Sequence, residues 1–380
     1  MKYTAKLTAL SPVFVGDEKG HRSPLEFFKE GPLVYVLSED KLPEILLMLK
    51  KVNHFMGYVM NSPSPSLYKY FETISDSEKN LIIKNATLRA VPAAASSVKN
   101  LRLHICDPVT LNPYIPASSI KGALRSALMH YFISDNSEEL RKHISKISRQ
   151  SRGTIKKEEA GKVLDFYYFQ NNKIRGNVKA RKGANTDLMR IIKISDAFSK
   201  QKDISGIVRV KVVSLNRDRG YHFSKIKGKE EEIEIFIEAI RPGSEFIFEL
   251  EIDDFLDSVI EGKNKHRSMK EMLIEALHLK SEQLIQEEKE FFEKAGLSNV
   301  KDYLEVLKKE GVNLRIGWGS GLLGTTAALL LKENERRILR DKFFQSRNSY
   351  IFPQSRKVVV TENEEISGTL GWCRLELITK

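Results

Sequence analysis

The chain has 380 residues, 41% hydrophobic and 29% charged, which describes a globular protein with room for two or three domains. Its two cysteines, Cys106 and Cys373, form no C-x-x-C pair, so neither a disulfide framework nor a cysteine zinc site is expected. No apolar run approaches the ~20 residues of a membrane helix, so a membrane partner is not expected either. The first residues lack a signal peptide's apolar centre, and we therefore expect a cytoplasmic location. The net charge of +12 is high for a metabolic enzyme and typical of a protein that binds a polyanion.

The first elements are a strand, a charged loop and a helical segment. Polar and apolar residues alternate over residues 2–15, which predicts a half-buried strand with Tyr3, Ala5, Leu7 and Ala9 on its inner face. The loop "GDEKGHRSP" follows, and a second strand is predicted at 33–37. From about 40 to 90 the pattern is helical, and we interpret it as an insertion.

The next clear element is a helix that begins in "PYIPASSIKGALRSAL". Ser118 or Ser119 is a good N-cap, and apolar residues follow at helical spacing. Lys121 and Arg125 lie four residues apart, so they share a face near the positive end of the helix dipole. Two cations at this end are unfavourable unless an anion binds there. The pattern therefore suggests a phosphate site. The alternative is an ordinary capped helix whose lysine faces water.

A strongly basic region follows this helix. Residues 141–193 hold 15 Lys or Arg against four acids, a local excess of +11. One interpretation is a solvated basic loop. The other is a phosphate-binding surface, because "YYFQNNKIRGNVKARKG" mixes aromatic, amide and cationic side chains as single-strand-binding surfaces do. Its candidate RNA-binding residues are Arg175, Lys179, Arg181 and Lys182.

The second half predicts more antiparallel structure. The two alternating runs joined by "RPGS" at 241–244 predict a hairpin, and residues 255–310 are helical. The segment "LNRDRGYHFSKIKGK", which holds Arg217 and Arg219, is predicted to be a basic loop or extended hairpin. We therefore expect an α+β fold of two sheet-and-helix units, residues 1–200 and 201–380, with helical insertions.

The segment "RIGWGSGLLGTT", residues 315–326, contains the pattern G-x-G-x-x-G. A dinucleotide site would need the rest of a βαβ unit, and only 56 residues follow Gly324; a P-loop needs lysine where Thr325 stands. Two interpretations remain: a loop that approaches a nucleic-acid backbone, or a tight passage of the chain over a sheet. The candidate RNA-binding residues here are Arg315, Gly317, Trp318, Gly319, Gly321 and Gly324.

Three segments together resemble the RAMP superfamily of CRISPR proteins. "DPVTLNPYIPASSIKGALRSAL" is similar to its serine-lysine helix, "LRIGWGSGLLGT" to its glycine-rich loop, and "SPVFVGDEKG" to its first strand and loop. With "TDLMRIIKISDA" and the chain length, the resemblance narrows to the fifth subunit of type III-A Csm complexes.

The resemblance implies two ferredoxin-like, RRM-related units and a role in binding guide RNA (crRNA) toward its 3′ end. Carried over by position, Ser118, Ser119, Lys121 and Arg125 would hold guide phosphates, and exchanging the two cations for alanine would weaken binding and leave folding intact. The implied partners are the crRNA, target RNA, the backbone RAMP subunit, the small helical subunit and host 3′–5′ nucleases that mature the guide. No cofactor or metal is implied.

Catalysis is expected to be absent, with one alternative. Backbone RAMPs that cut RNA carry an aspartate before a Ser-Pro-like step, where this chain has Arg22. An arginine serves neither as a base nor as a metal ligand. The alternative is an endoribonuclease that uses Asp17, Glu18 and His21 in the loop after the first strand. The eight histidines form no H-E-x-x-H or H-x-E zinc pattern.

Overall fold

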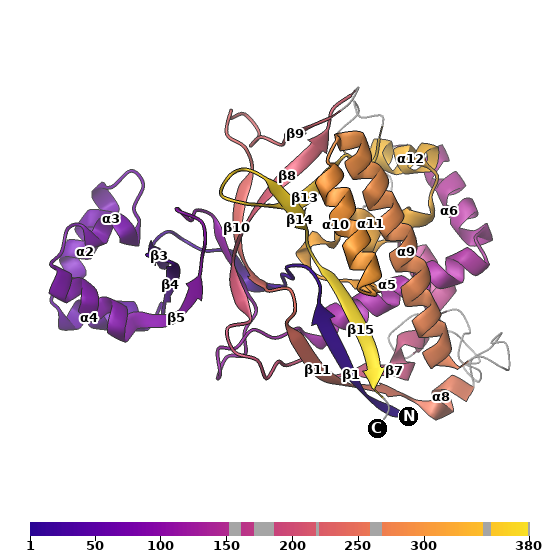
Figure 1. The fold of residues 1–380 in the computed structure, drawn as a ribbon, viewed down its shortest axis with the longest axis horizontal. Helices are drawn as coiled ribbons and strands as arrows, with labels where there is room; N and C mark the ends of the chain where they lie inside the picture. Colours follow the sequence, from indigo (N-terminus) through magenta and orange to yellow (C-terminus); the bar gives the residue numbers. More distant parts are fainter. Residues whose placement is uncertain (152–160, 171–185, 218–219, 259–267, 345–350, 379–380) are drawn as a thin grey trace.

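The computed structural model describes residues 1–380 except 152–160, 171–185, 218–219, 259–267, 345–350 and 379–380. The fold is α+β, as predicted, and its strands form a five-stranded, a seven-stranded and a three-stranded sheet in the described residues (Figure 1). No helix in this part of the chain is long and apolar enough to cross a membrane.

The five-stranded sheet brings the two ends of the chain together. Its strand β1 (Lys2–Ala9) pairs antiparallel with both β11 (Glu245–Ile252) and β15 (Trp372–Ile378). The short strands β12 (Leu314–Arg315) and β7 (Ile192–Ile194) complete the two edges. The predicted inner face of β1 is confirmed, because its alternate side chains are buried: Tyr3, Ala5, Leu7 and Ala9.

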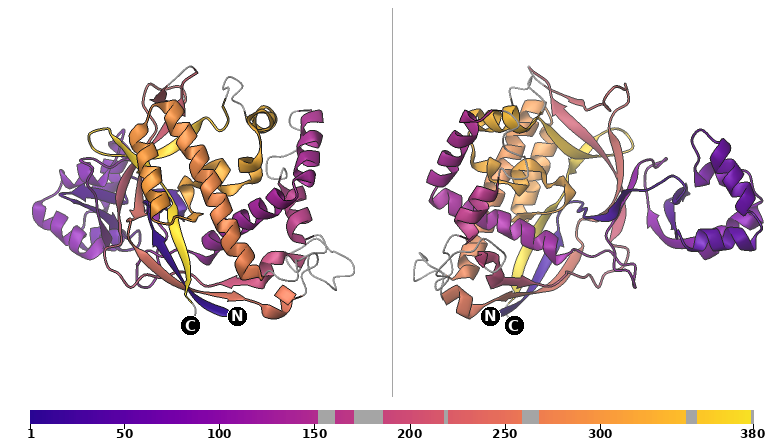
Figure 2. Two further views of the ribbon diagram at one scale, coloured as in Figure 1. Left: turned by 45° about the vertical axis from the view of Figure 1, so that its right-hand side comes forward. Right: turned by 180° about the vertical axis from the view of Figure 1, so that it is seen from behind.

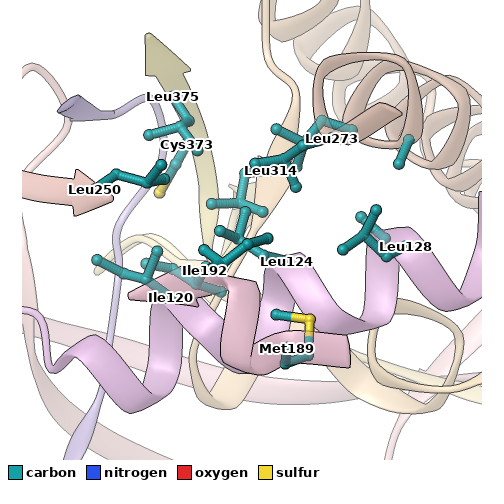
Figure 3. Close-up of a cluster of buried hydrophobic side chains, with 14 of the residues drawn as sticks. Ile120, Leu124, Leu128, Met189, Ile192, Leu250, Leu273, Leu314, Cys373 and Leu375 are labelled. Atoms are coloured by element: carbon teal, nitrogen blue, oxygen red, sulfur yellow. The ribbon is translucent and has the colours of Figure 1, made fainter. Parts of the chain in front are cut away.

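Helix α5 (Ala117–Asp135) packs against this sheet and forms the largest core cluster (Figure 3). Its apolar residues recur at three- and four-residue spacing, which places them on one face of the helix. Ile120, Leu124 and Leu128 are fully buried and meet Leu250 and Leu375 of the sheet in the same cluster. The long helix α9 (Met269–Ala295) lies against α5 on the other side of this core.

The seven-stranded sheet contradicts the predicted hairpin. Strand β10 (Glu234–Ile240) pairs with β8 (Ser205–Leu215) and β6 (Leu101–His104), whereas β11 belongs to the other sheet. Val13 exchanges two backbone hydrogen bonds with Ile240, at 3.1 and 2.8 Å, and so takes the position that β11 would have in a hairpin. The turn at 241–244 therefore carries the chain from one sheet to the other.

The remaining strands complete the edges of this sheet. β13 (Ser355–Val360) and β14 (Ile366–Thr369) follow β8 on one side, and β2 (Gly16–His21) pairs with β6 on the other. β9 (Tyr221–Phe223) folds back on β8, so the described part of the predicted basic hairpin is a hairpin. The other main-body helices are α6 (Glu138–Arg149), α7 (Lys162–Asp165), α8 (Asp254–Ser258), α10 (Ser298–Lys309), α11 (Gly321–Thr325) and α12 (Glu333–Phe343).

The predicted boundary near residue 200 does not separate the two larger sheets. The five-stranded sheet combines β1 and β7 from before this point with β11, β12 and β15 from after it, and the seven-stranded sheet takes β2 and β6 from before it. Two ferredoxin-like units remain a prediction.

A small unit projects from the main body (Figures 1 and 2). It consists of β3 (Phe27–Glu30), β4 (Leu33–Leu37) and β5 (Thr87–Pro92) with helices α1 (Lys41–Met48), α2 (Val52–Asn61), α3 (Leu67–Phe71) and α4 (Asp76–Ala86). The predicted helical insertion is therefore these four helices.

A buried ion pair joins this unit to the main body. Arg89 of β5 donates to both carboxylate oxygens of Glu238 on β10, at 2.7 and 2.5 Å. Glu238 is fully buried, and burial raises the pKa of its carboxyl group, an effect that the Arg89 guanidinium opposes. The backbone N–H of His104 adds a third hydrogen bond, at 3.1 Å. The guanidinium of Arg89 thus offsets the desolvation free energy of the ionised Glu238 carboxylate in the interior.

Replacing Arg89 with methionine is expected to lower the free energy of unfolding by about 3–5 kcal/mol, because Glu238 is left buried without its cation. Urea unfolding followed by circular dichroism measures this. The control is Lys79→Met, which breaks the more exposed pair with Glu30 and is expected to cost less than about 1 kcal/mol. Equal losses in both variants would contradict the assigned role of Arg89.

Candidate nucleic-acid interface

The start of helix α5 is capped differently from the prediction. The helix begins at Ala117 after Pro116, so Ser118 and Ser119 lie in its first turn and neither is the N-cap. The Asp196 carboxylate accepts the Ala117 N–H at 2.6 Å and supplies the negative charge that this end of the dipole favours. An anion is thus already present at the helix start, and it comes from the segment "KISDA" after the basic region.

Arg125 is engaged within the protein. Its NH1 group donates to both oxygens of Asp187, at 2.9 and 2.8 Å, and its NH2 group lies 3.2 Å from Asp165. Its guanidinium also stacks over the ring of Phe169, 4.1 Å from the ring centroid. The expectation that exchanging Arg125 leaves folding intact is therefore not supported, since alanine would leave both aspartates unpaired.

Lys121 has a different environment. Burial lowers the pKa of its ammonium group, whereas the nearby Asp187 raises it and Arg125 lowers it. No ion pair engages Lys121 among the described residues. Lys121 and the exposed Ser118 therefore remain candidates for phosphate contact, which stays a prediction.

Two glycines of the glycine-rich segment allow a close passage of the chain. A Cβ on Gly317, which has φ +78°, would lie 2.3 Å from the carbonyl oxygen of Phe14. A Cβ on Gly319 would lie 2.3 Å from the Cβ of Leu370. These positions correspond to the second interpretation, a tight passage over a sheet. Gly321 is exposed with free space around it, whereas Gly324 is buried beside Ser320.

Arg315 lies in the interior, which contradicts its predicted contact with RNA. Its side chain is 3% exposed, pairs with Glu288 at 3.3 Å and stacks over Trp372. Its Nε also donates to the carbonyl of Leu370 at 3.0 Å. A buried guanidinium with these partners stabilises the glycine-rich segment from the interior. It is not available to a phosphate at the surface.

Trp318 is part of a cationic and aromatic cluster at the surface. It packs its indole over the core of the seven-stranded sheet, next to Phe14. The Lys357 Nζ atom lies 4.2 Å from its ring centroid, and the Arg102 guanidinium carbon lies 5.4 Å from it. The Arg102 Nε donates to His21 Nε2 at 3.0 Å, because β2 and β6 pair these residues directly.

The cations of this cluster have no acidic partner among the described residues. Lys357 donates to the carbonyl of Trp318, and Arg102 bonds to His21. By contrast, Arg209 and Lys211 on the neighbouring strand share the carboxylate of Glu364. Burial lowers the pKa of Lys357, and the positive charges of Arg102 and Arg315 lower it further. A bound anion would relieve this repulsion, so the cluster favours a phosphate beside a stacking surface.

Arg102 and Lys357 were not predicted from the sequence. Arg102 lies between two buried leucines of β6, so alternation places it on the face opposite to them. Lys357 follows two exposed or half-exposed residues of β13 and nothing in its local pattern distinguishes it. Only the fold brings these two strands to the same indole ring.

The other predicted RNA-binding residues lie at the edge of, or outside, the described chain. Arg217 is exposed in the segment after β8. Five predicted positions fall outside the described residues: Arg175, Lys179, Arg181, Lys182 and Arg219.

The residues of the alternative nuclease site, Asp17, Glu18 and His21, lie on strand β2 and not in a loop. Asp17 pairs with Arg22, and His21 bonds to Arg102. His104 ends strand β6 and Cys106 lies beyond it, and both contact protein groups: His104 bonds to the backbone of Val15 and Tyr114, and Cys106 accepts from Arg89. No cluster of three metal-ligating side chains occurs in the part of the chain that the structure describes.

Comparison with known proteins assigns the family. The model of the RAMP superfamily matches residues 6–323, so the chain belongs to this superfamily. Within it the protein is Csm5-like: the Csm5 protein of Methanocaldococcus jannaschii is 22% identical, covering 98% of this chain and 88% of that protein. The crystal structure of T. onnurineus Csm5 has a TM-score of 0.66 and 20% identity, covering 97% of this chain and 99% of that one.

A second solved structure has the same fold. One chain of a Csm–crRNA–target RNA ternary complex from a type III-A CRISPR-Cas system matches with a TM-score of 0.70 and 21% identity. The match covers 99% of this chain and all (100%) of that one. The α+β architecture described above is thus shared over the full length.

Replacing Gly319 with alanine is expected to lower the free energy of unfolding by about 1–3 kcal/mol, because the new methyl group would overlap Leu370. Gly122 is the matched control, since a Cβ there meets nothing within 4 Å in the middle of α5. Gly122→Ala should stabilise by about 0.5–1 kcal/mol. Thermal unfolding compares the two, and a neutral Gly319→Ala would refute the close passage.

Proposed function

We propose that this protein is a non-catalytic RNA-binding subunit of a type III-A Csm effector complex. It caps the assembly at the 3′ side of the crRNA and supports crRNA maturation and antiviral interference. The observation that carries the proposal is the cluster of Arg102, Lys357 and Trp318, in which cations that have no acidic partner among the described residues surround a partly exposed indole. The full-length likeness to Csm5 supports the choice of complex.

RNA binding by this surface would be largely independent of sequence. Cations contact phosphates, which every nucleotide carries, and an indole stacks on any base. A guide RNA differs in sequence from one spacer to the next, so a subunit that holds many guides needs this kind of contact. The remaining partners follow from the same proposal: the backbone RAMP subunit, the small helical subunit, target RNA and maturation nucleases.

The rival function is an endoribonuclease. It would need Asp17 and His21 to act on one substrate, yet each bonds to a different arginine. RNA cleavage by the purified protein that is lost in Asp17→Ala or His21→Ala would favour this rival.

Removing one cation of the cluster is expected to weaken RNA binding and flatten its salt dependence. For Lys357→Met, the slope of log affinity against log salt concentration should fall by about one, because one phosphate contact is lost. For Trp318→Leu, the affinity for single-stranded RNA should fall roughly fivefold to 150-fold, from the loss of stacking. Fluorescence anisotropy at several salt concentrations measures both.

The control for these variants is Lys301→Met, which removes a lysine of α10 that is paired with Glu293 of α9. It should leave the salt slope unchanged. If Lys357→Met and Lys301→Met behave alike, the cluster is not the RNA interface.

The proposed role in the complex is tested in the native host. Purifying the tagged protein should recover CRISPR-derived guide RNAs and sibling Csm subunits. In a strain that lacks the gene, mature guides should be absent or should have longer 3′ ends. Recovery of the protein without such RNA and without such subunits would refute the proposal.

A further inference from the structure

Lys280 is a buried lysine that lies between the two elements predicted to bind RNA. It belongs to helix α9, and its residue is 7% exposed. Its ammonium group donates to the carbonyl of Gly324 at 2.6 Å and to the hydroxyl of Ser126. Gly324 is the last glycine of the glycine-rich segment, and Ser126 lies on α5, the helix that carries Lys121.

Burial of the Lys280 ammonium group is energetically unfavourable. No carboxylate forms an ion pair with it among the described residues, and burial lowers its pKa to about 7. A buried ammonium without an acidic partner costs free energy, whereas an apolar side chain of similar length would not. The Ser126 hydroxyl also lies 3.4 Å from the Gly324 carbonyl, so these two groups can satisfy each other without the lysine.

A second contact from α9 holds the same segment. Gln283, three residues after Lys280, donates to the carbonyl of Leu329 at 3.2 Å and bonds to His130 of α5 at 2.7 Å. Residues at this spacing share one face of a helix. One stripe of α9 therefore contacts both α5 and the chain that follows the glycine-rich segment, and Lys280 is its contact nearest to the glycines.

We propose that Lys280 is a positioning residue for RNA binding, which holds the glycine-rich segment against helix α5 so that the two present one surface to an RNA strand. The inference rests on the proposed function. It assigns the lysine to the geometry of the RNA surface, because the Ser126 hydroxyl can hydrogen-bond to the Gly324 carbonyl in its absence.

The test measures the RNA affinity and the thermal stability of Lys280→Met in the full-length protein, with a fluorescein-labelled single-stranded RNA of mixed sequence as the probe. We expect the dissociation constant to rise roughly threefold to tenfold, from the lost hydrogen bonds, while the melting temperature stays equal or rises. Lys280→Gln keeps a neutral donor at this place and should recover most of the affinity.

Lys289→Met is the matched control on the same helix. Lys289 pairs with Glu305 and does not contact the glycine-rich segment, so its loss should change the dissociation constant less than twofold. If Lys280→Met binds RNA as tightly as the wild type, or if Lys280→Gln binds no better than Lys280→Met, the positioning role is refuted. A lower melting temperature together with weaker binding would assign Lys280 to the fold alone and refute it too.

Ser126→Ala provides a second test in case Lys280→Met does not fold. It removes one acceptor of Lys280 and leaves the lysine in place. Weaker RNA binding by Ser126→Ala supports the positioning role, and unchanged binding overturns it. The proposed function fails separately, when the wild-type protein itself shows no salt-dependent affinity for the RNA.

Discussion

The arrangement of the candidate interface depends on one buried carboxylate. Glu288 of helix α9 is 1% exposed and pairs with Arg356 at 2.5 Å and with Arg315 at 3.3 Å. Burial raises the pKa of its carboxyl group, but the two guanidinium groups together hold it below the ordinary value. Arg315 begins the glycine-rich segment, and Arg356 precedes Lys357 on β13. The triad therefore fixes the two chain segments that carry Trp318 and Lys357.

Burying a triad of charged side chains carries a large desolvation free energy. Three charges must leave water, and their mutual attraction returns that cost only when the geometry is good. The arginines gain further contacts, since one stacks over Trp372 and the other over Phe291. Two arginines against one glutamate leave a positive charge in the interior, and the charge of Arg315 acts on Lys357, which has no acidic partner in the part of the chain that the structure describes.

Several cations of the described structure contact carboxylates, whereas Arg102 and Lys357 bond to neutral groups. Arg89, Arg125 and Arg209 each contact a carboxylate that another element supplies. An excess of positive charge over the whole chain attracts a polyanion from a distance. In the proposed interface, the cations that would contact the polyanion lie beside an indole on which a base could stack.

The sequence alone determined the class of fold, the strand and helix character of most elements, and the family. These follow from local periodicity and from motifs whose residues are neighbours in the chain: the inner face of β1, helix α5, and the glycine-rich segment. It could not separate cations that bind RNA from cations that bind aspartate, because Asp187 and Asp165 lie 62 and 40 residues after Arg125. For the same reason it assigned Arg315 to the surface.

Only the tertiary structure decided which strands pair and which side chains share a site. β10 and β11 are joined by a tight turn and still enter different sheets, because β1 and Val13 compete for their backbone hydrogen bonds. Arg102 and Lys357 are separated by more than 250 residues in the chain and meet at one indole ring. Pairing between distant strands depends on the packing of the whole core, which no local pattern encodes.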